Sequence, residues 1–389
     1  MHILFINARY TPEGIAGPAF TTQYLAEQLV REGSRATVIC RTDRPDVFQE
    51  VLEGVNLLRI GVRTPERQVL QVLANALDFH RPDIIHTLFP REFLLDRLAT
   101  LAQERRIPIV HTLLAFNLLC PRGSMMRDDK MCKTQCPDCR EATSVQRYFT
   151  EQVSAVVGIS RYMLDLHHRS ELFQNTSIQR VIHDAYAPPR PVTPSATTGK
   201  PLRLGYLGRM DPVKGIDLLL QTLTGPLSQR DWSLVLGGRG NPAYEAFLKT
   251  RYADPRIRFL GFVNPTDLLS QIDVLVVPSL LEEPLGRVWI EAYAHAVPVI
   301  GSRRGGIPEG IESGRTGLVF DPDRAGSLES ALTSVLDDCA LVDGMKRQAN
   351  EKWSREFTPI AIARQYQQVY SMLRTSGPST ASSPKRVTR

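Results

Sequence analysis

Short apolar runs alternate with longer amphipathic segments along most of the chain, and this alternation constrains the fold more than any other feature. Near the start, residues 2–7 predict a buried strand, residues 20–32 predict a helix that ends before Gly33, and residues 36–40 predict the next strand. Repeated units of this kind form parallel sheets with helices on both faces. The sequence therefore predicts an α/β protein with doubly wound sheets.

The predicted elements fall into two arrays. A segment rich in proline, serine and threonine, residues 187–200, predicts a linker between them. We expect a first domain at residues 1–186 with a cysteine-rich insertion at 120–139, and a second domain at 201–350. A helical segment at 351–374 should follow, and the polar, basic residues 375–389 should be disordered.

Composition and charge restrict the possible functions of the chain more than they restrict its fold. The 389 residues are 42% hydrophobic and 23% charged, which is ordinary for a globular protein, and the net charge is +6. Neither half is basic enough to indicate nucleic-acid binding, whereas the mild positive charge fits anionic ligands or an acidic membrane face. The chain begins with a strand instead of a signal peptide, so we expect a cytoplasmic protein, with peripheral contact to the inner face of the membrane as an option.

Arg209 and Lys214 lie in a turn that follows the predicted strand 204–207. The turn has the pattern G-R-x4-K-G and begins at Gly208, and an apolar-periodic helix follows it. Doubly wound sheets bind their ligands at the carboxyl ends of the strands. Two cations there suit a pyrophosphate, the arginine as a fork and the lysine as a point charge.

Glu283 and Glu291 lie eight residues apart, after the predicted strand 274–277. Pro284 suits a first helical position, so we expect a helix from there with Glu283 at its mouth. The two carboxylates would stand roughly 12 Å apart along that helix, beyond the ~5–10 Å of a glycosidase pair, and would hold two ends of one ligand. An anion site should form from the backbone N–H groups of Leu285, Gly286 and Arg287. An ordinary amphipathic helix with two solvated glutamates is the alternative.

These two motifs together resemble the nucleotide-sugar domain of retaining GT-B glycosyltransferases of family 4, also called glycosyl transferases group 1. Gly305 and Gly306 with Glu309, and the sequence GRTGLVFDP at residues 314–322, continue the pattern in the same order. The resemblance implies a GT-B fold, in which two Rossmann-like domains face each other across a cleft and the final helix crosses back to the first domain. It also implies a retaining hexosyltransferase that uses a nucleoside diphosphate sugar, as in polysaccharide biosynthesis.

The resemblance also assigns roles to residues of the second domain. Glu283 would hold hydroxyls of the donor sugar, Glu291 would hold the ribose, and the backbone near Phe262 and Val263 would face the base. Together with Gly208, the two cations of the first motif would bind the diphosphate and stabilise its charge as it leaves, so we expect no cofactor to be required for catalysis.

In the first domain the pattern is less complete. Gly17 falls on the second glycine of the family's Gly-Gly pair, and Ala16 replaces the first. At the end of strand 107–113 the family usually has a histidine that meets the donor sugar, whereas this chain has Leu114 and Ala115. His111 lies three residues earlier and should point to the other face, so we expect a packed, hydrogen-bonded core histidine there.

Four cysteines lie within twenty residues, whereas the other two are isolated. A cytosolic protein should not keep disulfides, so the cluster predicts a structural metal site that stiffens a loop on the acceptor side of the cleft. Zinc is the first choice and an iron–sulfur cluster the alternative, while free thiols and redox chemistry stay open. A subset of the family carries a similar insertion. The four residues are Cys120, Cys132, Cys136 and Cys139.

The sequence therefore predicts transfer of a sugar from a nucleoside diphosphate sugar to a hydroxyl of a glycan, a lipid-linked acceptor or a small molecule. Two alternatives remain. Because Leu114 and Ala115 replace polar residues, the chain could be a catalytically weak partner subunit that binds sugar nucleotides. A nucleotide-sugar epimerase of the same fold would need acid–base groups that the sequence does not show.

Overall fold

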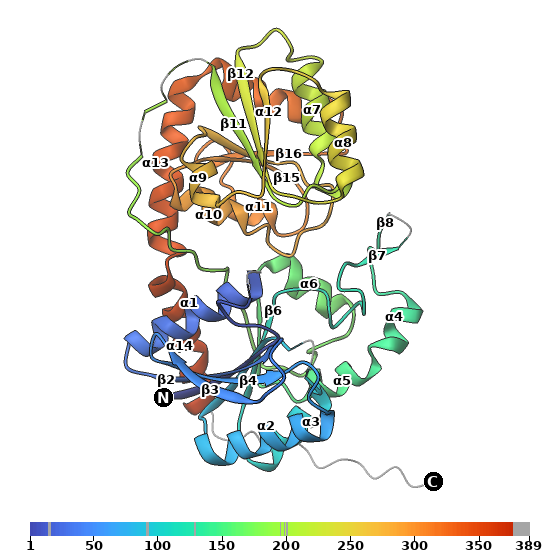
Figure 1. Cartoon of the computed structure of the whole chain (residues 1–389), viewed down its shortest axis with the longest axis vertical. Coiled ribbons are helices and arrows are strands. Elements are labelled where there is room, and N and C mark those ends of the chain that lie inside the picture. Colours follow the sequence, from blue (N-terminus) through green and yellow to red (C-terminus); the bar gives the residue numbers. More distant parts are fainter. Residues whose placement is uncertain are drawn as a thin grey trace.

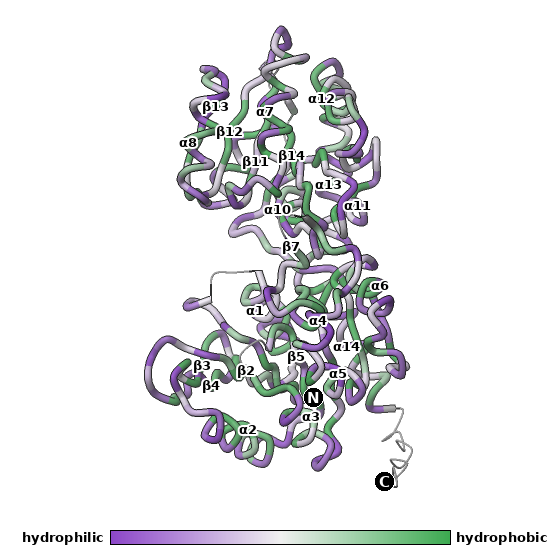
Figure 2. Tube along the Cα trace, turned by 90° about the vertical axis from the view of Figure 1, so that its right-hand side faces the viewer, coloured by the Kyte–Doolittle hydropathy of each residue, from purple (hydrophilic) through white to green (hydrophobic). Residues whose placement is uncertain are grey.

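The computed structural model describes residues 1–14, 17–90, 93–127, 130–194, 196–197, 199 and 201–375. Two sheets form the centres of two separate lobes (Figure 1), which we call the first and the second domain. The central strands of both sheets are among the hydrophobic parts of the trace (Figure 2), because strands covered on both faces by helices exclude water on both sides. The predicted strand–helix alternation is confirmed in both lobes.

The sheet of the first domain has eight strands, seven parallel and one antiparallel at the edge. In spatial order they are β10 (Ile178–Val181), β9 (Ala155–Gly158), β6 (Ile109–Leu113), β5 (Ile84–Phe89), β1 (His2–Asn7), β2 (Arg35–Thr42), β4 (Val55–Gly61) and β3 (Phe48–Leu52). The strand order reverses between β1 and β5, so the loops after these two strands lie at a topological switch point.

The helices of the first domain cover this sheet, and the first of them lies near the predicted range 20–32. They are α1 (Gly17–Arg31), α2 (Glu66–His80), α3 (Leu95–Glu104), α4 (Pro137–Ala142), α5 (Ser144–Glu151) and α6 (Arg161–Arg169). A small hairpin of β7 (Met126–Arg127) and β8 (Lys130–Met131) precedes α4. Ser160 caps α6, since its Oγ accepts a hydrogen bond of 3.1 Å from Met163 N.

The second domain contains a six-stranded parallel sheet. Its strands in spatial order are β13 (Ile257–Gly261), β12 (Trp232–Gly237), β11 (Leu202–Leu207), β14 (Val274–Val277), β15 (Val299–Ser302) and β16 (Gly317–Phe320). The order reverses between β11 and β14, which are the strands that precede the two motifs of the sequence. The topological switch point of this sheet is therefore the place where both motifs meet.

The helices of the second domain pack on both faces of this sheet. They are α7 (Ile216–Thr224), α8 (Pro242–Arg251), α9 (Pro265–Leu269), α10 (Val288–Ala294), α11 (Ile307–Gly310), α12 (Ser327–Asp337) and α13 (Cys339–Glu356), with a 3-10 turn η1 (Pro212–Lys214) before α7. None of the described helices is long and apolar enough to cross a membrane.

The last helix, α14 (Pro359–Thr375), leaves the second domain and packs against α1 of the first (Figure 1). It inserts two buried tyrosines into a polar cluster of the first sheet: His86 Nδ1 lies 2.7 Å from Tyr370 Oη, and Thr112 Oγ1 lies 3.1 Å from Tyr366 Oη. The expected helical segment at 351–374 thus comprises the end of α13 and nearly all of α14.

Candidate functional site

Lys214 and Glu283 meet at the switch point of the second sheet. Lys214 Nζ lies 2.5 Å from Glu283 Oε1, and Ser279 Oγ donates to the same oxygen at 3.1 Å. Both charged side chains are largely buried, with 22% and 14% of their surface exposed. The turn after β11 and the loop after β14 are therefore joined by one ion pair, although the two residues are 69 positions apart in the sequence.

The backbone packs these two loops together just as closely. Gly215 has φ of +71°, and a Cβ atom there would lie 1.9 Å from the carbonyl oxygen of Pro278. Leu280 N also donates to Val213 O at 2.9 Å. The glycine of the G-R-x4-K-G pattern is required by this close approach, since any side chain would push the two loops apart.

Arg209 lies at the surface of the same edge. Its side chain is 62% exposed, and it forms an ion pair with Asp211 at 3.1 Å rather than with Glu283. Gly208 N donates to Gly237 O at 3.0 Å, and Met210 N donates to Arg239 O at 3.0 Å, so the turn is held by the loop after β12. Exposed ion pairs of this kind contribute little stability, and Arg209 can exchange Asp211 for an anionic ligand at small cost.

The prediction of a helix from Pro284 is wrong. The helix α10 begins at Val288, four residues later, and Glu283 lies in the loop between β14 and α10. Gly286 has φ of +75°, which right-handed helical residues do not adopt, and Gly306 N binds the carbonyl of Glu283 at 2.8 Å. The spacing of about 12 Å along a helix therefore does not describe Glu283 and Glu291. Within the described part of the chain, no acceptor is hydrogen-bonded to the backbone N–H of Leu285, Gly286 or Arg287.

Glu291 lies in the first turn of α10, where Arg287 binds it with Nε 3.2 Å from Oε1. Arg287 also reaches the first domain: its Nη1 donates to the carbonyl of Gly17 at 3.2 Å and lies 3.4 Å from Asp184 Oδ2. Burial raises the pKa of both Asp184 and Glu291, and the charge of Arg287 opposes this shift. One buried arginine thus connects the predicted ribose ligand with the predicted glycine loop.

The sequence did not reveal this contact between the domains. Gly17, which falls on the second glycine of the family's Gly-Gly pair, begins α1 at this contact. Ala16 lies outside the described residues. Asp184 carries no motif and lies just before the linker, so only its buried position in the structure identifies it. Its side chain also accepts a hydrogen bond from Thr21 of α1 at 2.9 Å.

Phe262 and Val263 follow β13 at the carboxyl edge of the second sheet. Phe262 is 75% exposed, which is unusual for a phenylalanine and leaves an apolar surface at this edge. Gly238 N donates to Gly261 O at 2.7 Å, which places this loop beside the loop after β12. The residues predicted to face the base thus share one edge of the sheet with the predicted diphosphate and sugar residues.

The first domain contributes no titratable side chain at the end of β6. Leu114 is 8% exposed, and Ala115 follows it. His111 is a core residue as predicted: its Nδ1 lies 2.7 Å from Thr87 Oγ1, and its ring stacks on Phe173. Burial lowers the pKa of His111 to about 3, so it stays neutral at physiological pH.

The four cysteines of the insertion form no disulfide. Burial, together with hydrogen bonds to the thiols of Cys136 and Cys120, raises the pKa of Cys139 to about 12. Cys136 is the residue directly before α4, and its side chain makes no capping hydrogen bond there. However, the described residues include no group of three or more His, Cys, Asp or Glu side chains arranged to hold a metal ion. The metal site stays a prediction.

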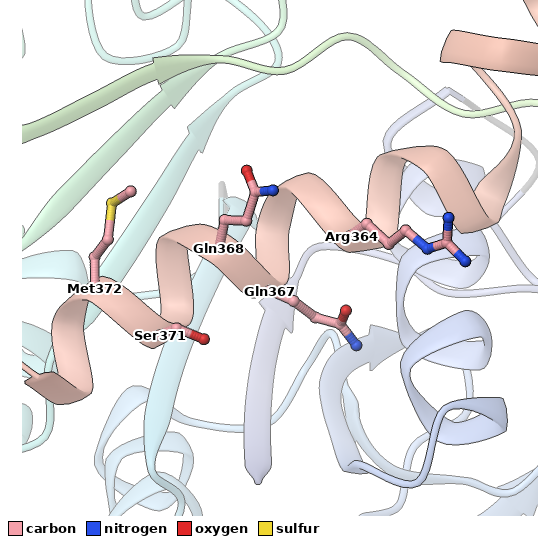
Figure 3. Close-up of a pocket in the computed structure, with 5 residues that line it drawn as sticks. All are labelled: Arg364, Gln367, Gln368, Ser371 and Met372. Atoms are coloured by element: carbon pink, nitrogen blue, oxygen red, sulfur yellow. The ribbon is translucent and has the colours of Figure 1, made fainter.

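A surface hollow of about 540 Å³ lies away from this edge. It runs along α14 and is lined by Arg364, Gln367, Gln368, Ser371 and Met372 (Figure 3). Gln367 donates to Glu32 of α1 at 2.7 Å. The hollow contains none of the motif residues, and it belongs to the packing of α14 on the first domain.

Comparison with known proteins agrees with this geometry. The family model described as glycosyl transferase 4-like domain matches residues 16–181, and the model described as glycosyl transferases group 1 matches residues 201–338. A D-inositol 3-phosphate glycosyltransferase of Corynebacterium efficiens is 26% identical, over 90% of this chain and 88% of that protein. A glycogen synthase of Mycobacterium tuberculosis is also 26% identical, over 95% of this chain and 94% of that protein.

Among solved structures, HepE of Anabaena in complex with UDP superimposes with a TM-score of 0.70 at 17% identity, over 96% of this chain and all of that one. Its likeness supports the fold, and the two doubly wound sheets confirm the predicted GT-B architecture. The two family models together cover both domains and most of the chain. This chain therefore belongs to the group 1 glycosyltransferases.

Proposed function

We propose that this glycosyltransferase moves a sugar from a nucleoside diphosphate sugar to a hydroxyl acceptor with retention of configuration. The observation that carries the proposal is the meeting of Lys214 and Glu283 at the switch point of the second sheet. Ligands of doubly wound sheets bind at such points, and this one faces the first domain through Arg287.

The donor would bind along the carboxyl edge of the second sheet. Its diphosphate would bind Lys214 and Arg209, because both cations lie in the turn after β11 and the ion pair of Arg209 with Asp211 is at the surface. The base would lie against the loop of Phe262 and Val263, and the ribose near Glu291. HepE, which has the same fold, has also been solved with UDP-glucose, and this supports a nucleotide-sugar donor.

The chemistry follows from the charges at this edge. When the bond between the sugar C1 and the phosphate oxygen breaks, Lys214 and Arg209 stabilise the charge that develops on the diphosphate. Glu283 holds the sugar hydroxyls, and no second carboxylate of the motifs is placed to form a covalent intermediate. The acceptor oxygen then bonds to C1 on the face that the phosphate leaves, while the acceptor proton moves to the departing phosphate oxygen. This sequence retains the configuration.

The acceptor would approach from the first domain. The two relatives are named for different reactions, one on D-inositol 3-phosphate and one in glycogen synthesis. We therefore propose a hydroxyl acceptor of the glycan, lipid-linked or small-molecule class. The cysteine-rich insertion belongs to the first domain, so we place it beside the acceptor as well.

The proposal is tested with purified protein and a panel of nucleoside diphosphate sugars. Release of the nucleoside diphosphate identifies the donor even without an acceptor, and the anomeric proton of the transfer product shows the configuration by NMR. We expect a product with the configuration of the donor. Binding without release or transfer would favour the partner subunit suggested by Leu114 and Ala115, and an inverted product would contradict the mechanism.

A further inference from the structure

Ser160 of the first domain contacts the loop that carries Glu283. Its hydroxyl lies 2.5 Å from the carbonyl oxygen of Pro284, the residue directly after Glu283. Ser160 is completely buried, and its Oγ also caps α6 by accepting from Met163 N. A single hydroxyl thus ties the start of α6 to the backbone beside the proposed sugar ligand.

Glu309 makes the reciprocal contact from the second domain. Its Oε2 accepts from Arg161 N at 2.6 Å, and its Oε1 accepts from Tyr162 N at 2.8 Å. The first N–H groups of a helix have no partner within the helix, and a carboxylate forms short, charge-assisted hydrogen bonds with them. Here the carboxylate that caps a helix of one domain comes from the other domain, so this cap exists only when the two domains are together.

On the side away from α6, Gly305 and Gly306 pack directly against the loop of Glu283. A Cβ atom on Gly305 would lie 2.1 Å from the carbonyl oxygen of Glu283, and one on Gly306 would lie 2.6 Å from Pro284 O and 2.8 Å from Ser160 Cβ. These two glycines lie directly before α11, which carries Glu309. The loop is therefore packed between Gly305–Gly306 and the start of α6. If α6 moved away, the loop would lose its contacts on one side.

We propose that Ser160 and Glu309 are positioning residues that lock the domains together and hold Glu283 in place for the transfer reaction. The inference rests on the proposed function, because Glu283 is the residue that is positioned. Neither Ser160 nor Glu309 touches substrate. The donor can bind to the second domain without the lock, whereas transfer requires acceptor and donor to be held in one geometry. Loss of the lock therefore lowers kcat and leaves nucleotide affinity nearly unchanged.

The test compares Glu309→Ala and Ser160→Ala with Asp338→Ala. Asp338 is a matched control, because its carboxylate caps α13 within the second domain, with Oδ1 2.9 Å from Leu341 N. We expect the two lock variants to lower kcat about 10- to 100-fold and to change the Kd of UDP less than about 3-fold. Glu309→Gln and Ser160→Thr should recover part of the loss, because each keeps one of the hydrogen-bonding groups. An equal loss of kcat in Asp338→Ala would overturn the proposal.

A second measurement needs no turnover. In the wild type, the amides of Arg161 and Tyr162 should exchange slowly with deuterium, since they are bonded to Glu309. Glu309→Ala should accelerate their exchange at least about 10-fold, and Asp338→Ala should not. Unchanged exchange in Glu309→Ala would show that the lock does not form. A wild type without transferase activity would refute the proposed function, while these exchange rates would still decide whether the domains are locked.

Discussion

Lys214 and Glu283 are each other's nearest charged partner, so a change to either side chain alters the environment of both. We predict that Lys214→Ala and Arg209→Ala each lower kcat by about 10²–10³, because each removes a charge that stabilises the leaving diphosphate. Lys249→Ala is the control, since Lys249 lies on the outer helix α8 over the ring of Phe259. Steady-state rates at saturating donor are the measurement, and near-normal rates in both variants would show that the diphosphate binds elsewhere.

Substitutions of Glu283 and Glu291 should differ in their effect on the affinity for the free nucleotide. Glu283→Gln should reduce sugar transfer far more than affinity for a nucleoside diphosphate, because the part of the donor that this carboxylate holds is the sugar, which the free nucleotide lacks. Glu291→Gln should weaken both, since it meets the ribose and also loses the charge that Arg287 binds. Calorimetric titration with the free nucleoside diphosphate and rates of transfer with the complete donor distinguish the two. Equal losses of nucleotide affinity would contradict the assigned roles.

At the scale of single elements, the sequence predicted the strands that position the motifs, because buried parallel strands are short apolar runs bounded by turn residues. The sequence did not predict the backbone conformation where long-range contacts determine it. The start of α10 is set by Gly286 and by the bond from Gly306 to Glu283, and neither is visible in the local pattern. The hairpin of β3 and β4 was not predicted either. Its two-residue turn consists of Glu53 and Gly54, which both have positive φ.

The insertion at residues 120–139 allows a prediction about metal content. If its four cysteines bind one zinc or iron, the metal stabilises the first domain, and its removal lowers the melting temperature but not affinity for the nucleotide in the other domain. Elemental analysis of protein purified without added metal is the measurement. Fewer than about 0.2 metal atoms per chain, with four thiols that titrate freely in the folded protein, would leave the cluster as free cysteines.

At the scale of the whole molecule, α14 and the linker join the two domains. Buried histidines make the stability of the folded chain depend on pH. His86 contacts Tyr370 of α14, and burial lowers its pKa well below the usual value. Burial also lowers the pKa of His111 to about 3 and that of His167 to about 4. These histidines bind protons more weakly in the folded chain than in the unfolded chain, so their contribution to stability is complete above about pH 6.5 and is lost as the pH falls toward the folded-state values.

We therefore predict that the free energy of unfolding decreases between pH 7 and pH 5. Each of the three histidines should contribute a slope that approaches about 1.4 kcal/mol per pH unit below its unfolded pKa. Urea denaturation at several pH values provides the measurement. A free energy of unfolding that does not change over this range would mean that these histidines are not buried in solution.

The arrangement of the two domains could be predicted from the sequence only through the resemblance, because contacts such as Arg287 with Gly17 join residues 270 positions apart. The domain boundaries at residues 186 and 350 stay predictions. The Glu283 loop, in contrast, was placed at the correct edge of the sheet from local signals, since the carboxyl ends of parallel strands share one edge.

The most direct test of the account is a crystal structure with the nucleoside diphosphate that binds most tightly among UDP, GDP and ADP. We predict that the diphosphate oxygens lie within hydrogen-bonding distance, about 2.7–3.2 Å, of Lys214 Nζ and the Arg209 guanidinium. Arg209 should then have left Asp211. A diphosphate bound at another place, with Lys214 still paired to Glu283 and Arg209 to Asp211, would contradict the central claim.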